Sequence, residues 1–262
     1  MRKVSVFPVI LQCKTKGKIN MELNKEMTVG AIVAEDFNRA RLFERLGIDY
    51  CCHGSDTLND ACAKKGLDPV DVLSRLENNN ETDGGAPDFA SWPLDLLVDY
   101  VLKKHHRSFH QHHEELLKLV EKVDRVHGDH HPELHEVRLA VASSFEELDN
   151  HFAKEEQILF PQFYEIFAAH EEGHEPAPFH CGSISYPIQQ MMLEHETTGS
   201  IWQHIVELTE NFTTPTDGCA SYRLMNHELY EFFSKLKEHV ALENNLIFPG
   251  FIKLEQQTSN NK

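Results

Sequence analysis

Apolar residues recur at helical spacing through four long stretches that fill the carboxyl-terminal two-thirds of the chain. These stretches cover 94–126, 133–170, 187–212 and 218–253, and the segments between them carry glycine or proline. Glycine and proline end helices, and connections this short join antiparallel neighbours. The pattern predicts an all-α protein built around an up-down four-helix bundle.

Shorter helical patterns precede these four stretches. Residues 28–46 show helical spacing up to Gly47, and two further helices are expected at 57–65 and 69–76. Residues 78–87 are polar, contain glycine and lack periodicity, which is typical of a linker. We therefore expect a disordered tail at 1–22, a small helical domain at 23–77, a linker at 78–91, the bundle at 92–254 and a second tail at 255–262.

Polar residues interrupt the apolar seam of each predicted bundle helix. Every seam carries a histidine and two seams also carry a glutamate, the set being His106, His151, Glu155, His195, His239 and Glu243. Burying these groups is costly unless something pairs with them, and a metal cluster would satisfy them together. Four imidazoles and two carboxylates suit two non-haem iron ions, each with two nitrogen ligands and both bridged by the carboxylates.

An internal repeat strengthens this interpretation. The segment HFAKEEQILFP at 151–161 matches HVALENNLIFP at 239–249 in register, so the pattern His-x3-Glu-x4-Phe-Pro occurs twice. A His and a Glu four residues apart place a nitrogen and an oxygen on one helix face, about 6 Å apart along the axis. A purely structural bundle with satisfied core histidines is the weaker alternative, because packing gives no reason for the repeat.

The other histidines are expected to lie outside this centre. On a straight helix His127 would be about 31 Å from His106, so we expect it to end its helix beside Gly128. His113, about 10 Å from His106, is expected to be a neighbouring-layer group or a core histidine. The histidines expected to be solvated, with adventitious metal binding as the weaker alternative, are His105, His110, His112, His130, His131 and His135.

Two glutamates close to the predicted ligands are candidates for a supporting role. Glu147 lies one turn before His151, and Glu194 directly precedes His195. Such carboxylates can orient imidazoles or relay protons, with surface exposure as an equally open alternative. No catalytic residue is assigned.

A pair of adjacent cysteines, Cys51 and Cys52, follows the helix that stops at Gly47. Adjacent side chains are expected to point in different directions, so a structural zinc site is not predicted. An exposed, reactive dithiol and two ordinary buried cysteines remain the two alternatives.

Composition limits the classes of partner and compartment. A formal net charge of −17 argues against nucleic acid or an anionic membrane as the partner, and no run approaches the length of a membrane span. Six irregularly spaced cysteines favour reduced thiols and a cytoplasmic location. Residues 1–13 resemble a secretory signal only superficially, because Pro8 interrupts them; a tail, or Met21 as the true initiator, is favoured.

Together these motifs resemble the family of iron-sulfur cluster repair di-iron proteins, also called repair of iron centres proteins. The resemblance runs from about Thr28 to Phe251, through the Cys-Cys motif, both His-x3-Glu-x4-Phe-Pro segments and the Glu194-His195 pair. It implies a short Cys-Cys domain joined to a hemerythrin-like domain, with the same six ligands around a di-iron centre. It also aligns His127 with a family histidine, and His53 departs from the glycine usual after the cysteine pair.

The resemblance implies repair of iron-sulfur proteins damaged by nitrosative or oxidative stress, rather than a dedicated metabolic activity. We expect an oxo- or hydroxo-bridged centre, apo or damaged iron-sulfur proteins as clients, and nitric oxide, oxygen or peroxide as small ligands; a homodimer remains open. The rival is a hemerythrin-like carrier or sensor of oxygen or nitric oxide. That pattern would place a histidine at position 199 and an aspartate at 244, where this chain has Gly199 and Asn244.

Overall fold

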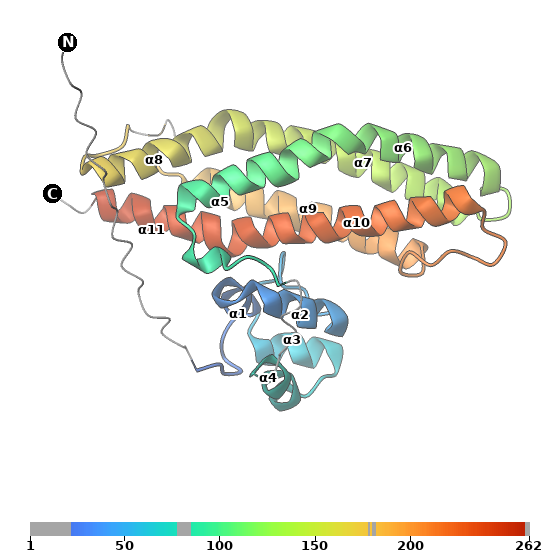
Figure 1. Cartoon of the computed structure of the whole chain (residues 1–262), viewed down its shortest axis with the longest axis horizontal. Helices are drawn as coiled ribbons and strands as arrows, with labels where there is room; N and C mark the ends of the chain where they lie inside the picture. The colour runs from blue at the N-terminus through green and yellow to red at the C-terminus, as the bar shows by residue number, and fades with distance from the viewer. Residues whose placement is uncertain (1–21, 78–84, 178, 180–181, 260–262) are drawn as a thin grey trace, which may run out of the picture.

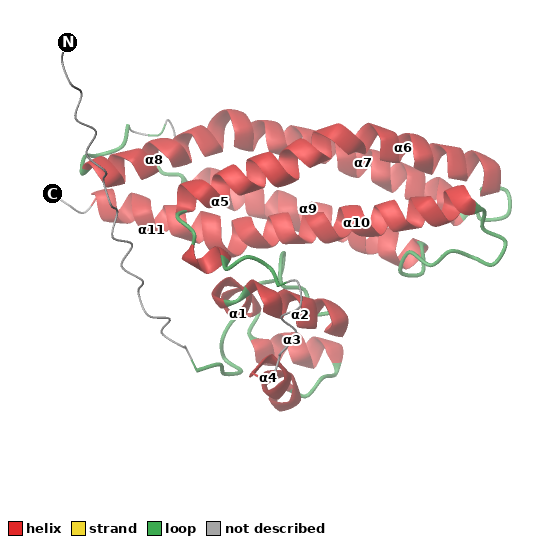
Figure 2. Ribbon diagram, viewed as in Figure 1, coloured by secondary structure: helices red, strands yellow, loops and turns green. Residues whose placement is uncertain are grey.

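The computed structural model describes residues 22–77, 85–177, 179 and 182–259. The predictions for the tail before residue 22, for residues 78–84 of the linker and for the last three residues therefore fall outside the described residues. Figure 2 shows helices joined by loops throughout the described chain, which confirms the all-α prediction. No helix within the described ranges has the length and apolar character needed to cross a membrane.

Four long helical rods form the bundle and lie side by side in Figure 1. Three of them consist of two α-helices joined by a π-helical turn, and the remaining one is a single helix. The elements are α5 (Leu94–Tyr100), η3 (Val101–His106) and α6 (Arg107–His127); α7 (Glu133–Lys154), η4 (Glu155–Leu159) and α8 (Phe160–Glu172); α9 (Ser185–Leu208); and α10 (Ala220–Leu242), η5 (Glu243–Ile247) and α11 (Phe248–Ser259). The tail predicted from 255 is wrong over 255–259, because α11 continues there and buries Thr258.

The π-helical turns were not predicted, and two of them follow from the repeated Phe-Pro step. Within η4 the N–H of Phe160 bonds to the carbonyl of Glu155, five residues back, and the N–H of Phe248 bonds in the same way to Glu243 in η5. The next residue is a proline, which lacks an N–H and whose ring would clash with the carbonyl four residues before it. A widened turn relieves both problems, and such turns are frequent at functional sites.

The amino-terminal module consists of four short α-helices: α1 (Val29–Glu35), α2 (Ala40–Leu46), α3 (Leu58–Lys65) and α4 (Pro69–Glu77). The single helix expected over 28–46 is wrong. Asp36 adopts an extended conformation, and its carboxylate accepts from the N–H of Asn38, which starts a separate 3-10 turn, η1 (Phe37–Arg39). The predicted stop is present, with Gly47 in the left-handed conformation at φ 66°.

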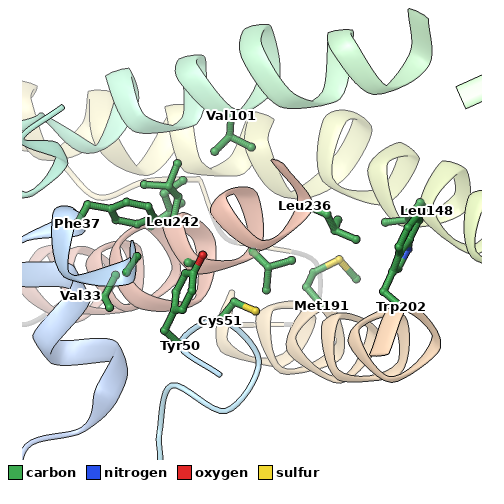
Figure 3. Packing of buried hydrophobic residues seen from close by; sticks show 14 of the residues in the cluster. Val33, Phe37, Tyr50, Cys51, Val101, Leu148, Met191, Trp202, Leu236 and Leu242 are labelled. Carbon is green, nitrogen blue, oxygen red and sulfur yellow. The ribbon is translucent and has the colours of Figure 1, made fainter. Parts of the chain in front are cut away.

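The module packs directly on the bundle, and the two parts share one hydrophobic core. Figure 3 shows Val33, Phe37 and Tyr50 of the module close to Leu242 of α10. The end of the predicted linker is also part of this core. Phe89, in the 3-10 turn η2 (Phe89–Ser91), is 1% exposed; its ring meets Phe37 of the module edge-on and packs at a tilt against Tyr100 of the bundle.

Glycines allow the closest approach between module and bundle. A Cβ on Gly30 would lie 2.2 Å from Oδ1 of Asn245, a residue of η5, and one on Gly54 would lie 2.8 Å from the same atom. Asn245 in turn donates from Nδ2 to the carbonyl of Tyr50 at 3.0 Å. The module is thus fixed against the π-helical turn that follows one of the predicted metal ligands.

Candidate metal centre

The six predicted ligands meet in the middle of the bundle. One histidine comes from each rod, and the two glutamates are the first residues of η4 and η5. All six are buried, with exposed fractions between 0% and 3%. Residues from four rods can converge in this way because each replaces an apolar residue on the seam that faces the bundle axis.

The six side chains divide into two clusters that share both glutamates. One cluster contains His106 and His239, the other contains His151 and His195, and within each cluster the ligand atoms lie within 4.8 Å of one another. Glu155 is the first of the two glutamates common to both clusters. Its Oε2 lies 3.5 Å from Nε2 of His106, and its Oε1 lies 3.4 Å from Nε2 of His151.

Glu243 is arranged in the same manner. Its Oε1 is 2.9 Å from Nε2 of His239, while its Oε2 is 3.2 Å from Nε2 of His195. Each carboxylate therefore turns one oxygen toward each pair of imidazoles. This is the arrangement that two bridging carboxylates require.

Unpaired polar atoms show that these residues fit a bound metal. Both carboxylate oxygens of Glu155 and of Glu243 are buried without a hydrogen-bond partner, as are Nε2 of His106 and Nε2 of His239. Buried polar groups are normally hydrogen-bonded, so orphaned atoms that all face one point need an explanation. Imidazole nitrogens and carboxylate oxygens together suit iron and other transition metals.

Hydrogen bonds on the far side of the imidazoles fix their orientation. Nδ1 of His106 donates to Glu156 at 3.0 Å, and Nδ1 of His151 donates to Glu194 at 2.9 Å. Because a carboxylate only accepts, each bond leaves Nε2 as the nitrogen that faces the centre. Glu194 therefore takes the orienting position that its place in the sequence suggested.

His195 has a neutral partner instead of a carboxylate. Its Nδ1 donates to Oδ1 of Asn244 at 2.9 Å, and Nδ2 of Asn244 donates to the carbonyl of Cys51 at 3.0 Å. Nε2 of His195 lies 3.0 Å from Nε2 of His151, so the two nitrogens need a shared proton or a cation between them. One end of the centre is thus tied to the cysteine loop through a single amide.

The net pKa shifts of the two histidines of the repeat have opposite signs. Burial lowers the pKa of His151, but the nearby charge of Glu155 and the hydrogen bond to Glu194 outweigh it and raise the pKa to about 10. At His239 burial prevails over Glu243 and lowers the pKa to about 3. The hydrogen bond from His151 holds the pKa of Glu194 at about 2. The charged groups are therefore distributed unevenly across the centre.

Other expectations around the centre are changed by the structure. Glu147 is exposed, and none of the bonds described for the chain joins it to a ligand, so its supporting role finds no support. His105 was expected to be solvated, but it is 8% exposed, stacks on His239 and faces Glu238 at 3.5 Å. Sequence reasoning did not identify Glu156, although it directly follows a predicted ligand. Two consecutive glutamates at the start of a π-helical turn would have been the available signal.

Two further histidines of the rod that carries His106 lie away from the ligands. His113 is half-buried beside Phe109 and Asp149, which fits the core position expected for it. His127 lies at the end of α6, as expected, and its Nε2 contacts Sγ of Cys219 at 3.2 Å.

The Cys-Cys loop packs against the centre. Sγ of Cys52 donates to the backbone carbonyl of His195 at 3.4 Å, and the two cysteine sulfurs lie 3.7 Å apart. The expectation that the side chains point apart is wrong, and of the two alternatives left open the buried one holds for Cys51. The side chains converge with Asp49 into a group that could hold a metal, instead of pointing apart, and Cys51 is buried. A hydrogen bond to Cys52, followed by burial, raises the pKa of Cys51, so this thiol stays protonated at neutral pH.

The loop also explains the two residues that differ from a hemerythrin pattern. Asn244 supplies the amide that joins the loop to His195, which an aspartate could not do because it lacks a donor. Gly199 lies against the loop, where a Cβ would come within 2.7 Å of Sγ of Cys52. A histidine at that position would occupy the space that the cysteine fills.

Known protein families match both parts of the chain. A domain of unknown function, DUF542 (ScdA_N), matches residues 25–80, and the hemerythrin HHE cation binding domain matches residues 97–251. The iron-sulfur cluster repair protein YtfE of Yersinia pseudotuberculosis is 31% identical over 232 residues, which cover 88% of this chain and 99% of that protein. The protein of the same name from Musicola paradisiaca is 30% identical over 234 residues, 88% of this chain and 98% of that protein. The chain therefore belongs to the family of iron-sulfur cluster repair proteins in which a small amino-terminal domain precedes a hemerythrin HHE domain.

Proposed function

We propose that this protein repairs iron-sulfur clusters damaged by nitrosative or oxidative stress, using two iron ions held between the four rods. The observation that carries the proposal is the pair of buried carboxylates, each with one oxygen facing each pair of imidazoles. Relatives of similar length are named iron-sulfur cluster repair proteins, which supports the same role.

In this proposal His106 and His239 would hold one iron, His151 and His195 would hold the other, and Glu155 and Glu243 would offer one oxygen to each. Bound iron would supply a redox-active Lewis acid with exchangeable positions for nitric oxide, oxygen or peroxide. The chain contributes the fixed imidazole orientations, and the apolar rings packed around them keep bulk water away. Phe152, for example, stacks on His106 with ring centroids 4.2 Å apart.

Supply of iron to a damaged client is the form of repair that the outer hydrogen bonds favour. The imidazoles of His106 and His151 are backed by carboxylates, which increase ligand basicity, whereas His195 is backed by the neutral amide of Asn244. The bond from His195 to its iron is therefore expected to be weaker than the bond from His151 to the same iron. Redox chemistry on nitric oxide is compatible with the same site, whereas the experiment below measures iron supply directly.

A hemerythrin-like carrier or sensor is the competing function. The two positions that would distinguish it hold Gly199 and Asn244, and both are occupied with docking the cysteine loop. The site thus has four imidazoles for two metals and lacks the additional histidine that the hemerythrin pattern places at position 199. This smaller set of nitrogen ligands favours iron release or redox chemistry over firm, reversible storage of oxygen.

The test compares wild type with Glu155→Leu and His195→Leu after anaerobic purification. Metal content and absorption spectra are measured first, and transfer of iron to an apo iron-sulfur protein is measured next. Glu147→Leu is the matched control, because it changes an exposed glutamate two turns before Glu155 on the same rod. About two irons per chain in wild type and control, lost in both ligand variants, with transfer to the apo-protein, would support the proposal. Two irons with reversible oxygen binding and no transfer would favour the carrier, and absence of iron would refute both.

A further inference from the structure

A cysteine and a histidine form a close pair at the end of the bundle opposite the amino terminus of α5. Cys219 immediately precedes α10, and His127 is the last residue of α6, so both lie where these rods end in Figure 1. Nε2 of His127 is 3.2 Å from Sγ of Cys219. Cys219 is exposed, and the pair is about 30 Å along the rod from the metal centre.

Neighbouring contacts hold this pair in place. The ring of Tyr222, which is 5% exposed, packs against the imidazole of His127 with centroids 5.4 Å apart. Just before Cys219, the carbonyl of Gly218 accepts from Arg223 at 3.0 Å. Asn226, which is buried, donates to the carbonyl of Thr213 in the same loop at 3.0 Å. The thiol is therefore presented by an anchored loop, although its sulfur remains open to solvent.

The surroundings of Cys219 favour its thiolate. The hydrogen bond from His127 and the backbone amides at the start of α10 lower the pKa of Cys219 to about 7. Other charged groups at this end include Lys122, which donates to Ser221, and Arg223, which donates to the carbonyl of Gly218. His131 uses both ring nitrogens to contact Glu133 and Asp217 at 3.1–3.2 Å. The imidazole of His127, 3.2 Å from the sulfur, is the side chain that acts most strongly on it.

The other three described cysteines are less accessible than Cys219, and Cys52 is half-buried with its Sγ donating to the carbonyl of His195. Cys51 is buried, and its pKa is raised by the hydrogen bond to Cys52 and by burial. Cys62 is 0% exposed, and burial raises its pKa as well. A thiol reacts as its thiolate and needs access, so Cys219 combines the two required properties.

We propose that Cys219 and His127 form a thiol-modification site that reacts with small disulfides such as glutathione disulfide. The Cys219 thiolate attacks one sulfur of the disulfide, a new sulfur–sulfur bond forms, and the other half leaves as a thiolate that takes a proton from solvent. The small disulfide is the oxidant: Cys219 is oxidised to the mixed disulfide while the leaving half is reduced to a thiol. Excess thiol reverses the reaction by the same step.

A metal site at this position fits the geometry less well. His127 and Cys219 supply two donor atoms, whereas His131 is already held by Glu133 and Asp217. A tetrahedral zinc site normally takes four protein ligands, or three with water. A paired, exposed thiol near neutral pKa is instead close to the optimum for thiol–disulfide exchange.

The experiment follows modification of Cys219 in the full-length, iron-loaded protein by glutathione disulfide between pH 5.5 and 9.5. Residual thiols are alkylated, and cleavage after glutamates releases Cys219 within residues 211–228, which contain no other cysteine. The variants are Cys219→Ser, His127→Gln and, as the matched control, His130→Gln, which removes an exposed histidine from the same end of the bundle. Helix content and iron content show whether each variant is folded.

In wild type and in the His130→Gln control, the rate is expected to rise with pH to a midpoint near 7. In His127→Gln the midpoint should move up by about one unit or more, toward a free thiol near 8.5. The rate at pH 7 should fall only about threefold, because a more basic thiolate is also intrinsically more nucleophilic. Excess thiol should restore the unmodified protein. An unchanged midpoint in folded His127→Gln, an equal shift in the control, or modification of Cys62 as fast as that of Cys219 would overturn the proposal.

Discussion

Replacing Glu155 with methionine should raise the free energy of unfolding of the metal-free protein. It should also abolish the stabilisation that iron binding gives to wild type. The side chain is 0% exposed, and both of its oxygens lack hydrogen-bond partners. Without a metal, this carboxylate is a buried charge whose desolvation is compensated only by nearby histidines. Methionine has a similar length and volume, is apolar and adapts its shape to irregular spaces.

The magnitude follows from the cost of burying charge. Exchanging a buried ion pair for apolar residues of similar size is often neutral or stabilising, by about 1–4 kcal/mol. Removing only one partner is normally damaging because an unpaired charge remains, but His151 can respond by losing its proton, and it keeps its hydrogen bond to Glu194. The free energy of unfolding of the metal-free variant is therefore expected to be about 1–3 kcal/mol higher than that of metal-free wild type.

Iron should reverse the order of stability. A ligand present at 100 times its dissociation constant stabilises the folded state by about 2.7 kcal/mol, and wild type offers two such positions. Glu155 contributes an oxygen to both clusters, so the variant loses a ligand at each of them. Iron-loaded wild type should then exceed the variant in stability, although the variant is the more stable protein after chelation.

The assay is anaerobic denaturant unfolding followed by circular dichroism, for chelated and iron-loaded samples, with iron content measured in parallel. Glu147→Met is the control, because it makes the same exchange at an exposed site on the same rod and should leave both measurements near wild type. A chelated Glu155→Met that is less stable than chelated wild type would show that the carboxylate stabilises the bundle without metal. A variant that still binds two irons would show that Glu155 is not shared by the clusters.

Three further changes test other parts of the structure. Gly199→Ala would bring a Cβ within 2.7 Å of Sγ of Cys52. Denaturant unfolding should show a loss of stability of about 1–3 kcal/mol from this clash, reduced by up to about 1 kcal/mol because alanine favours the helix. An increase in stability would contradict the close docking. Glu194→Gln removes the carboxylate that orients His151 and should weaken iron binding about 10–100-fold in competition with a chelator. The folded pKa of Glu194, about 2, is below its ordinary 4.5, so the stability that its charged form contributes is present above pH 4.5 and lost as pH falls toward 2. The free energy of unfolding of Glu194→Gln should therefore depend less steeply on pH over that range than that of wild type. Thr57→Ala removes the cap of α3 and should cost about 1 kcal/mol in unfolding, while iron content stays unchanged; loss of iron would contradict a purely local role.

Sequence patterns predicted the local parts of this fold because their causes are local. Helical spacing of apolar residues and the glycine and proline separators were enough to place the four rods. The repeat beginning at His151 and at His239 indicated two helices that present the same pair of ligands. The predictions failed where short-range rules competed, as at Asp36, whose side chain caps a new turn and divides the first helix.

Other features depend on contacts between residues far apart in the chain. The orienting role of Glu156 toward His106 joins two rods, and the burial of Cys51 depends on docking against η5. Sequence spacing along one helix contains no information about such pairs. For this reason the sequence left open whether the two cysteines are exposed or buried. Docking of the cysteine loop on the bundle buries Cys51.

The sequence by itself determined the helical architecture and the composition of the candidate centre, because periodicity and ligand spacing act within single helices. Only the tertiary structure decided how the carboxylates face both imidazole pairs, because that requires the relative positions of four rods. It also decided that Asn244 and Gly199 serve the cysteine loop, since the loop lies nearly 150 residues or more away in sequence. Side-chain packing between distant segments fixes these relations.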